Sequence, residues 1–266
     1  MSGSLRLLRS EGTSASANMA IDEVILLGME DGSSPPTLRV YTFSPPAVTI
    51  GRFQTLSDEM MEKLEALDME VVRRPTGGRA VVHGSDLAYS VIASVNDPVL
   101  GGSIKETYRK ISERLGLALS ALGIEASFEP VRGSARYQSS PSCFDTSVMY
   151  ELRIGDEKIA GSAQTRRGGA FLQQGTIAFA PPCVDYVLLF GDGARMPRGL
   201  RELSPERVTF ESLATQIGRA FGVGDSASSL SPSERRRMDA LLGKYESDEW
   251  TQFGENSCAI SIYEAR

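Results

Sequence analysis

Five stretches of the chain combine helical spacing of apolar residues with helix-capping residues at their ends. The most amphipathic places Ile111, Leu115 and Leu119 on one stripe. Ser57 caps another stretch, and the serine-proline pair at 231–232 suits the first turn of a third. The pattern therefore predicts helices over residues 16–30, 57–67, 105–122, 204–221 and 231–245.

Short apolar runs rich in β-branched and aromatic residues separate these helices and predict strands. They cover residues 37–41, 47–50, 70–72, 87–92, 148–154 and 170–180, and Lys158 opens one more after a turn at 155–157. The segment 126–141 is rich in Ser, Pro and Arg, which predicts a mobile surface loop. We expect one catalytic domain over residues 1–266, in which 204–250 is a helical C-terminal part that either flanks the sheet or packs on it.

Composition narrows the class of protein. With 266 residues, 41% of them hydrophobic and 23% charged, the chain can bury a large globular core. The net charge of −6 argues against a nucleic-acid partner, and no apolar run is long enough to predict a membrane partner. The N-terminus lacks the apolar core of a secretory signal, and Cys143, Cys183 and Cys258 lack disulfide or metal spacing. We therefore expect a cytoplasmic, thiol-reduced protein without a metal site.

The segment 73–84 is the densest in chemistry. It joins Arg73 and Arg74 to the pair Gly77-Gly78 and to His83, the only histidine. Adjacent glycines permit positive φ and let a ligand approach the main chain, while two arginines suit a carboxylate, a phosphate or the polar end of an acyl carrier group. The alternative is an ordinary hairpin with solvated arginines. The length and mixed chemistry of the segment favour a site.

A second dense segment runs from Lys158 to Gln164 and is followed by the strand at 172–177. A lysine beside a Gly-Ser-Ala run combines a movable ammonium with a backbone free of bulky side chains. That combination suits a groove for an apolar chain or a phosphate, with Lys158 beside the reacting carbonyl. The alternative is a small-residue strand packed under a helix, with Lys158 solvated at its edge.

Together these segments resemble the lipoate-protein ligase and octanoyltransferase superfamily, which also includes biotin-protein ligases. The resemblance extends to residues 17–23, 50–54, 244–245 and Trp250, and so covers nearly the whole chain. It implies an α/β (α+β) fold with a mixed, mostly antiparallel sheet flanked by helices. It also implies a tunnel for lipoyl or octanoyl groups, with Lys158 contacting the activated acyl carbonyl. The residues expected to bind substrate are Arg73, Thr76, Gly77, Gly78, His83, Gly161, Ser162 and Ala163.

Two chemistries compete within this superfamily, and Cys143 decides between them. Its Cys-Phe setting resembles the LipM branch of octanoyltransferases, whose nucleophilic cysteine occupies this loop. That branch implies transfer of octanoate from acyl carrier protein, through a cysteine thioester, to a lysine of a lipoyl domain or of the glycine cleavage H protein, without a cofactor. A thiolate serves both half-reactions because it attacks thioesters and leaves readily. Cys183 and Cys258 lie outside matching motifs and are interpreted as structural.

Alternatives remain open at this point. An ATP-dependent lipoate-protein ligase would use ATP and Mg, with residues 132–140 as an adenylate-binding loop and Cys143 as an incidental thiol. A catalytically silent protein that binds acyl carriers would keep the fold alone. The segment 172–175 has glutamines where members often have histidine, which leaves fewer titratable groups there. His83 either hydrogen-bonds the loop or the acyl carbonyl, or only orders the turn, and we do not assign it as a general base.

Overall fold

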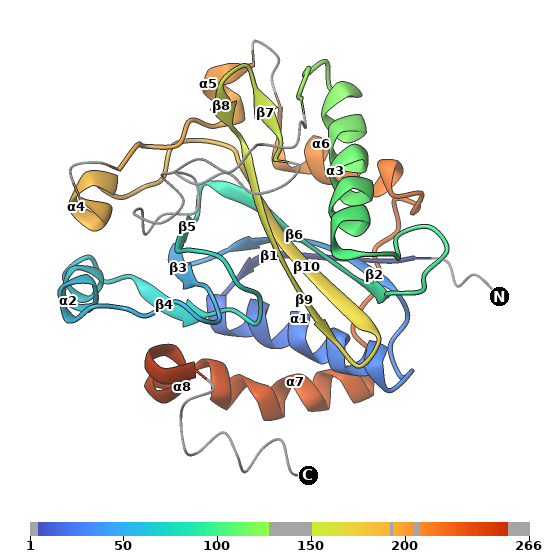
Figure 1. The fold of residues 1–266 in the computed structure, drawn as a ribbon, viewed down its shortest axis with the longest axis horizontal. Helices are drawn as coiled ribbons and strands as arrows, with labels where there is room; N and C mark the ends of the chain where they lie inside the picture. The colour runs from blue at the N-terminus through green and yellow to red at the C-terminus, as the bar shows by residue number, and fades with distance from the viewer. Residues whose placement is uncertain (1–4, 128–150, 192–193, 205–207, 255–266) are drawn as a thin grey trace.

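The computed structural model describes residues 5–127, 151–191, 194–204 and 208–254. Its largest sheet has five strands in the order β1-β2-β6-β10-β9 (Figure 1). Only the β1–β2 pair is parallel, and the other three neighbouring pairs are antiparallel. The mixed, mostly antiparallel sheet expected from the sequence is therefore confirmed. These strands are β1 (Arg6–Thr13), β2 (Thr37–Phe43), β6 (Asp86–Ser94), β9 (Ala160–Arg167) and β10 (Ala170–Ala178).

A smaller sheet, in the order β4-β3-β5, lies beside the first. Its strands are β3 (Ala47–Ile50), β4 (Glu70–Arg73) and β5 (Val81–His83). Because β4 and β5 pair with opposite edges of β3, the glycine turn between them crosses the small sheet. The hairpin alternative is therefore wrong, and so are its solvated arginines, because Arg73 and Arg74 are only 2% and 6% exposed.

Helices cover both faces of the large sheet (Figure 1). One face packs against α1 (Ala15–Glu30), and α7 (Pro232–Tyr245) lies on the outside of α1. The other face holds the largest apolar cluster, which includes residues of α3 (Ile104–Ser120) and α6 (Phe210–Ala220). The remaining elements are short: α2 (Asp58–Ala66), α4 (Tyr186–Phe190), α5 (Leu200–Leu203), α8 (Asp248–Phe253), β7 (Arg153–Ile154) and β8 (Glu157–Lys158).

Two helix starts follow the predicted caps, because Ser57 and Ser231 accept hydrogen bonds from backbone N–H groups of their helices. Ser103, which had not been predicted as a cap, forms a complete capping box with Glu106. The start predicted at residue 204 is wrong, because α6 begins at Phe210 after the Thr209 cap. The predicted loop 126–141 falls largely outside the described residues, and of the predicted strand 148–154 the described part, 151–154, contains the short strand β7 at Arg153–Ile154. Strand β1 and helix α8 had not been predicted.

The C-terminal helices are tied to the N-terminal half by partly buried polar contacts. Arg6 of β1 donates two hydrogen bonds to Glu234, and Lys244 pairs with Glu23 of α1 at 2.9 Å. Tyr245 also donates to Glu23, at 2.7 Å. The helical part at 232–253 therefore packs on α1 and β4 rather than projecting as a separate flank.

Candidate active site

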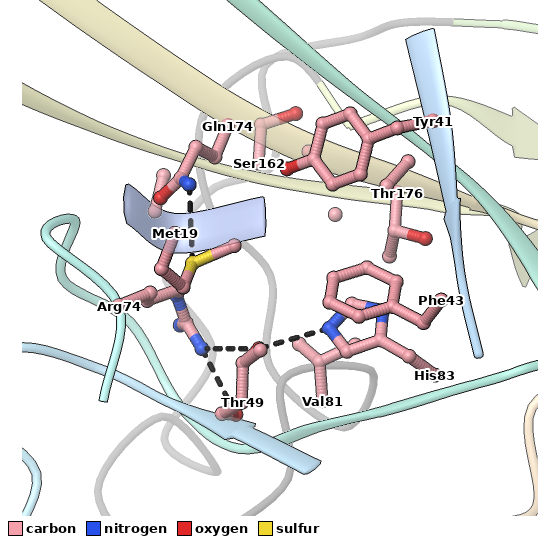
Figure 2. Close-up of a pocket in the computed structure, with 14 residues that line it drawn as sticks. Met19, Tyr41, Phe43, Thr49, Arg74, Val81, His83, Ser162, Gln174 and Thr176 are labelled. Carbon is pink, nitrogen blue, oxygen red and sulfur yellow. Dashed lines mark hydrogen bonds between the residues drawn. The ribbon is translucent and has the colours of Figure 1, made fainter. Parts of the chain in front are cut away.

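A pocket opens between the large sheet, the small sheet and α1 (Figure 2). Ligand sites commonly have mostly apolar walls and a few placed polar groups. Strands of both sheets supply most of the lining, and α1 adds Met19. The lining residues are Met19, Tyr41, Phe43, Thr49, Arg74, Val81, His83, Ala88, Gly161, Ser162, Ala163, Gln174, Gly175 and Thr176.

A chain of hydrogen bonds forms the wall at the small sheet. The Arg74 guanidinium donates to the carbonyl and hydroxyl oxygens of Thr49, at 3.1 and 3.3 Å. Thr49 Oγ1 lies 2.9 Å from His83 Nε2, and His83 Nδ1 lies 2.7 Å from Asp86 Oδ2. The Phe43 ring stacks on the imidazole at a centroid distance of 3.9 Å. Both ring nitrogens of His83 therefore have partners within the wall.

Asp86 is the charge that orients this imidazole. Burial disfavours its ionisation, but the charge of His83 and hydrogen bonds from His83, Thr176 and Gly84 outweigh burial and lower the pKa of Asp86. Thr176 donates its hydroxyl proton to the same carboxylate. Asp86 was not predicted from the sequence, although it follows the only histidine by three residues, a spacing that signals such a pair.

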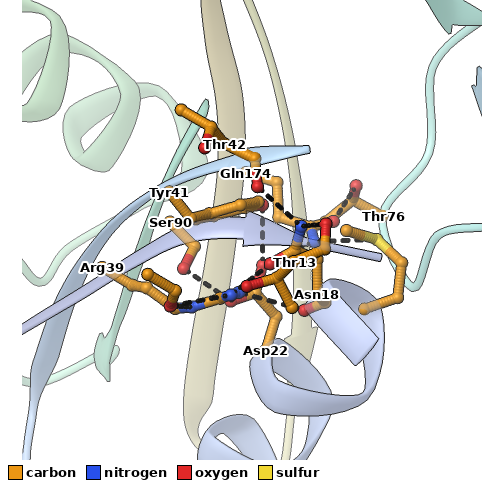
Figure 3. A network of polar contacts seen from close by, with 11 residues as sticks. Thr13, Asn18, Asp22, Arg39, Tyr41, Thr42, Thr76, Ser90 and Gln174 are labelled. Atoms are coloured by element: carbon orange, nitrogen blue, oxygen red, sulfur yellow. Dashed lines mark hydrogen bonds and ion pairs between the residues drawn. The ribbon is translucent and has the colours of Figure 1, made fainter. Parts of the chain in front are cut away.

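A second polar network, centred on Asp22 of α1, underlies the opposite wall (Figure 3). The buried carboxylate pairs with Arg39 at 3.0 Å and accepts hydrogen bonds from Tyr41 at 3.0 Å and Ser90 at 2.7 Å. Burial, followed by the neighbouring Asp22 charge, raises the pKa of Tyr41 well above its ordinary value. Tyr41 therefore stays protonated and remains a donor to Asp22.

Gln174 joins this network to the glycine turn. Its Nε2 donates to Asp22 at 2.8 Å, and its Oε1 accepts from Thr76 Oγ1 at 2.7 Å. One side chain of β10 thus links α1 to the turn that follows β4. From the sequence, Gln174 was notable only because members of the superfamily often have histidine in this segment. In the structure its amide acts both as a hydrogen-bond donor and as an acceptor.

Arg73 lies outside the pocket lining, and its guanidinium is enclosed by backbone carbonyl groups. Nε donates to Trp250 O at 3.0 Å, while Nη1 and Nη2 donate to carbonyls of the 51–54 segment and of α8. Trp250 Nε1 returns a hydrogen bond of 2.9 Å to Arg73 O. Burial lowers the pKa of Arg73 below its ordinary value. The described contacts give this side chain a scaffolding position, and its expected contact with a ligand stays a prediction.

The glycines allow close approach of main chains. A Cβ on Gly51 would lie 1.9 Å from the Gly78 carbonyl oxygen, so the two segments pack backbone to backbone. Gly78 has a φ of 92°, the left-handed region that favours glycine. On the pocket floor, a Cβ on Gly175 would lie 2.5 Å from the Tyr89 ring. Thr76, Gly77 and Gly78 thus shape the turn beside the pocket without lining it.

Lys158 is buried and lies 2.7 Å from Glu151 Oε1. The alternative of a solvated lysine at the strand edge is therefore wrong, although Lys158 does not line the pocket. Cys143 and Cys258 lie outside the described residues, and Cys183 is an exposed free thiol. Of the residues predicted to bind substrate, the structure brings His83, Gly161, Ser162 and Ala163 together in the lining.

Within the described ranges, no group of three or more His, Cys, Asp or Glu side chains is arranged to hold a metal ion. No helix in the same part of the chain is long and apolar enough to cross a membrane. The lining residues that were not predicted from the sequence are mostly apolar or small, and they reach the pocket from five strands and one helix. They are Met19, Tyr41, Phe43, Thr49, Val81, Ala88, Gln174, Gly175 and Thr176.

Comparison with solved structures supports the fold. A lipoate protein ligase from T. acidophilum with bound lipoic acid superposes with a TM-score of 0.74 at 23% identity, covering 95% of this chain and 99% of that one. A lipoate-protein ligase A bound with ATP gives 0.72 at 24% identity, covering 96% of this chain and 99% of that one. At these identities the likeness concerns the fold alone.

Sequence comparison is more specific. Octanoyltransferase LipM of Kyrpidia tusciae is 39% identical to this chain, covering 92% of it and 97% of the relative. The LipM protein of Carboxydothermus hydrogenoformans is 44% identical, covering 89% and 94%. The model of the lipoyl protein ligase A/B catalytic domain matches residues 14–225. The resemblance inferred from the motifs is thus confirmed, and the chain belongs to the lipoyl protein ligase A/B catalytic domain family.

Proposed function

We propose that this chain is an octanoyltransferase of lipoate biosynthesis that moves an octanoyl group from acyl carrier protein to a lysine of a lipoyl domain. Relatives named octanoyltransferase LipM, 34–44% identical and matched over most of their length, support an acyltransferase. The acceptor is a lipoyl domain or the glycine cleavage H protein, and the reaction runs in the cytoplasm.

One observation favours a thioester mechanism over an adenylate mechanism: the guanidinium groups of Arg73 and Arg74 already donate hydrogen bonds within the protein. Nε, Nη1 and Nη2 of Arg73 donate to six carbonyl oxygens. Arg74 donates to Thr49, Gly77 and Arg79. A guanidinium has only five N–H donors, so a phosphate at this turn would have to displace bonds already made. The turn therefore suits the wall of an acyl pocket better than a phosphate cradle.

The proposed reaction passes through a thioester on Cys143. The Cys143 thiolate attacks the thioester carbonyl of the octanoyl donor, so that an S–C bond forms to Cys143 and the S–C bond to the carrier breaks. The carrier thiolate leaves and takes up a proton. The neutral amine of the acceptor lysine then attacks the new thioester, forms a C–N bond, breaks the S–C bond to Cys143 and gives up one proton to solvent, which leaves the amide and the Cys143 thiolate. No adenylate is required because the incoming acyl group is already activated, so neither ATP nor Mg enters the scheme.

Lys158 is the proposed electrostatic partner of this chemistry. Its ammonium is buried, and a buried charge acts more strongly on a developing oxyanion than a solvated one does. Glu151 fixes the position of that ammonium through the 2.7 Å ion pair. Lys158→Ala should therefore lose turnover, and a variant that turns over normally would remove Lys158 from the scheme.

Intact mass spectrometry tests the thioester. The protein is incubated with octanoyl-acyl carrier protein in the absence of ATP, alongside Cys143→Ala and the matched variant Cys183→Ala, which changes the exposed thiol. The proposal predicts an octanoyl adduct on the wild type and on Cys183→Ala, and none on Cys143→Ala. If no adduct forms while ATP-dependent lipoylation survives Cys143→Ala, the protein is a ligase. Carrier binding without either activity would indicate a silent binding protein.

A further inference from the structure

Four lining residues of the pocket stand side by side in one row across the large sheet. Gly161 of β9 is paired with Thr176 of β10, Thr176 with Ala88 of β6, and Ala88 with Tyr41 of β2. All four line the pocket. Resting on the proposed function, we propose that this row measures the length of the acyl chain, with Ala88 beneath its last carbons and Tyr41 as the end stop.

The direction of the chain follows from exposure along the row. Beside Gly161, the residues Ser162 and Ala163 are partly exposed, and β9 is the edge strand of the sheet. Ala88 and Tyr41, at the other end, are only 2% and 3% exposed. An acyl chain therefore enters over the β9 edge, keeps its polar carbonyl there, and extends its apolar end toward β2.

The length of the row matches an eight-carbon chain. Neighbouring strands lie about 4.8 Å apart, so the two steps from Gly161 to Ala88 span roughly 10 Å. An extended chain advances roughly 1.2 Å per single bond, so the seven C–C bonds of an octanoyl group span about 8 Å. With the carbonyl over Gly161, the terminal methyl reaches Ala88 and stops short of Tyr41.

Tyr41 is held rigidly enough to act as a stop. Its hydroxyl donates to Asp22 at 3.0 Å, and the Arg39 guanidinium lies 3.9 Å from the centroid of its ring. Figure 2 shows the ring at the side of the pocket opposite Arg74. A longer chain would have to displace this ring and break its bond to a buried carboxylate, which is costly. The three smaller residues of the row, Gly161, Thr176 and Ala88, leave space for the chain as far as the Tyr41 ring.

The test enlarges Ala88. We compare kcat/KM for hexanoyl-, octanoyl- and decanoyl-acyl carrier protein in the wild type, in Ala88→Val and in the control Ala93→Val. Ala93 is equally buried on the same strand but belongs to the core cluster on the opposite face. Because one methylene in an apolar pocket changes specificity about tenfold or more, Ala88→Val should raise the hexanoyl-to-octanoyl ratio by at least roughly tenfold. Ala93→Val should keep the wild-type ratio.

A second variant and a binding assay test the chain-length preference of the pocket separately from the proposed transfer reaction. Tyr41→Leu should raise decanoyl use relative to octanoyl, and Tyr41→Phe, which keeps the ring but loses its bond to Asp22, should raise it less. Binding of hexanoic, octanoic and decanoic acids is measured by calorimetry on the same proteins. Suppose that the wild type transfers no acyl group, yet Ala88→Val shifts the binding preference toward hexanoic acid. The row then determines chain length, and the proposed reaction is refuted. If Ala88→Val and Tyr41→Leu both keep the wild-type chain-length preference, in turnover and in binding, the proposal that the row measures chain length is refuted.

Discussion

Replacing Arg73 by methionine should destabilise the fold while leaving acyl binding intact. The substitution keeps an apolar stem but removes the guanidinium that donates to Trp250, Thr251 and Gln252 of α8 and to the 51–54 segment. Hydrogen bonds from a charged donor contribute about 1.5–3 kcal/mol each, and the two sets of carbonyls count as roughly two independent links. We therefore expect a loss of about 3–6 kcal/mol in the free energy of unfolding.

Urea unfolding followed by tryptophan fluorescence measures this loss, because Trp250, the single tryptophan, lies at the Arg73 contact. For a chain of this size, in which 1 kcal/mol shifts Tm by about 2 °C, the same loss lowers Tm by about 6–12 °C. The matched control is Arg109→Met on α3, whose partner Glu113 lies four residues away on a partly exposed helix face. Its loss should stay below about 0.5 kcal/mol. An Arg73→Met protein of wild-type stability but with a much higher KM for the acyl donor would refute the scaffolding role.

Three further outcomes follow from the structure. Glu234→Gln should cost up to about 3 kcal/mol at neutral pH, because hydrogen bonds, chiefly from Arg6, outweigh burial and lower the Glu234 pKa from 4.5 to about 2. That contribution is present above pH 4.5 and disappears as pH falls through 2, so the variant and the wild type should converge in acid unfolding. Asp22→Asn should cost about 3–5 kcal/mol in urea unfolding, because it leaves a buried arginine unpaired. Gly51→Ala should lower acyl-chain binding in calorimetry, because its methyl group collides with the Gly78 carbonyl.

Local features of this fold were predictable from the sequence. The caps Ser57 and Ser231 each bond to a backbone group three residues later, so the information lies within one helical turn. The glycine motif was recognised as a site because its residue types are unusual together. Short elements such as α8, with six residues, carry too little periodicity to be read in this way.

The roles of individual motif residues depended on distant partners. Arg73 looked like a ligand for an anion, but its partner Trp250 is 177 residues away and binds through a backbone carbonyl, which leaves no trace in the residue types. The row from Gly161 to Tyr41 depends on strand register, which the pattern of single strands does not fix. Gln174 and Thr176 did carry a signal, because polar residues two apart in an apolar strand share one face.

The most direct measurement is the net reaction with a purified lipoyl domain as acceptor. Octanoyl-acyl carrier protein without ATP is compared with free octanoate plus ATP and Mg, and the mass of the lipoyl domain is followed. The account predicts octanoylation from the carrier thioester alone and no product from free octanoate. Octanoylation that requires ATP, with no product from the thioester, would contradict it.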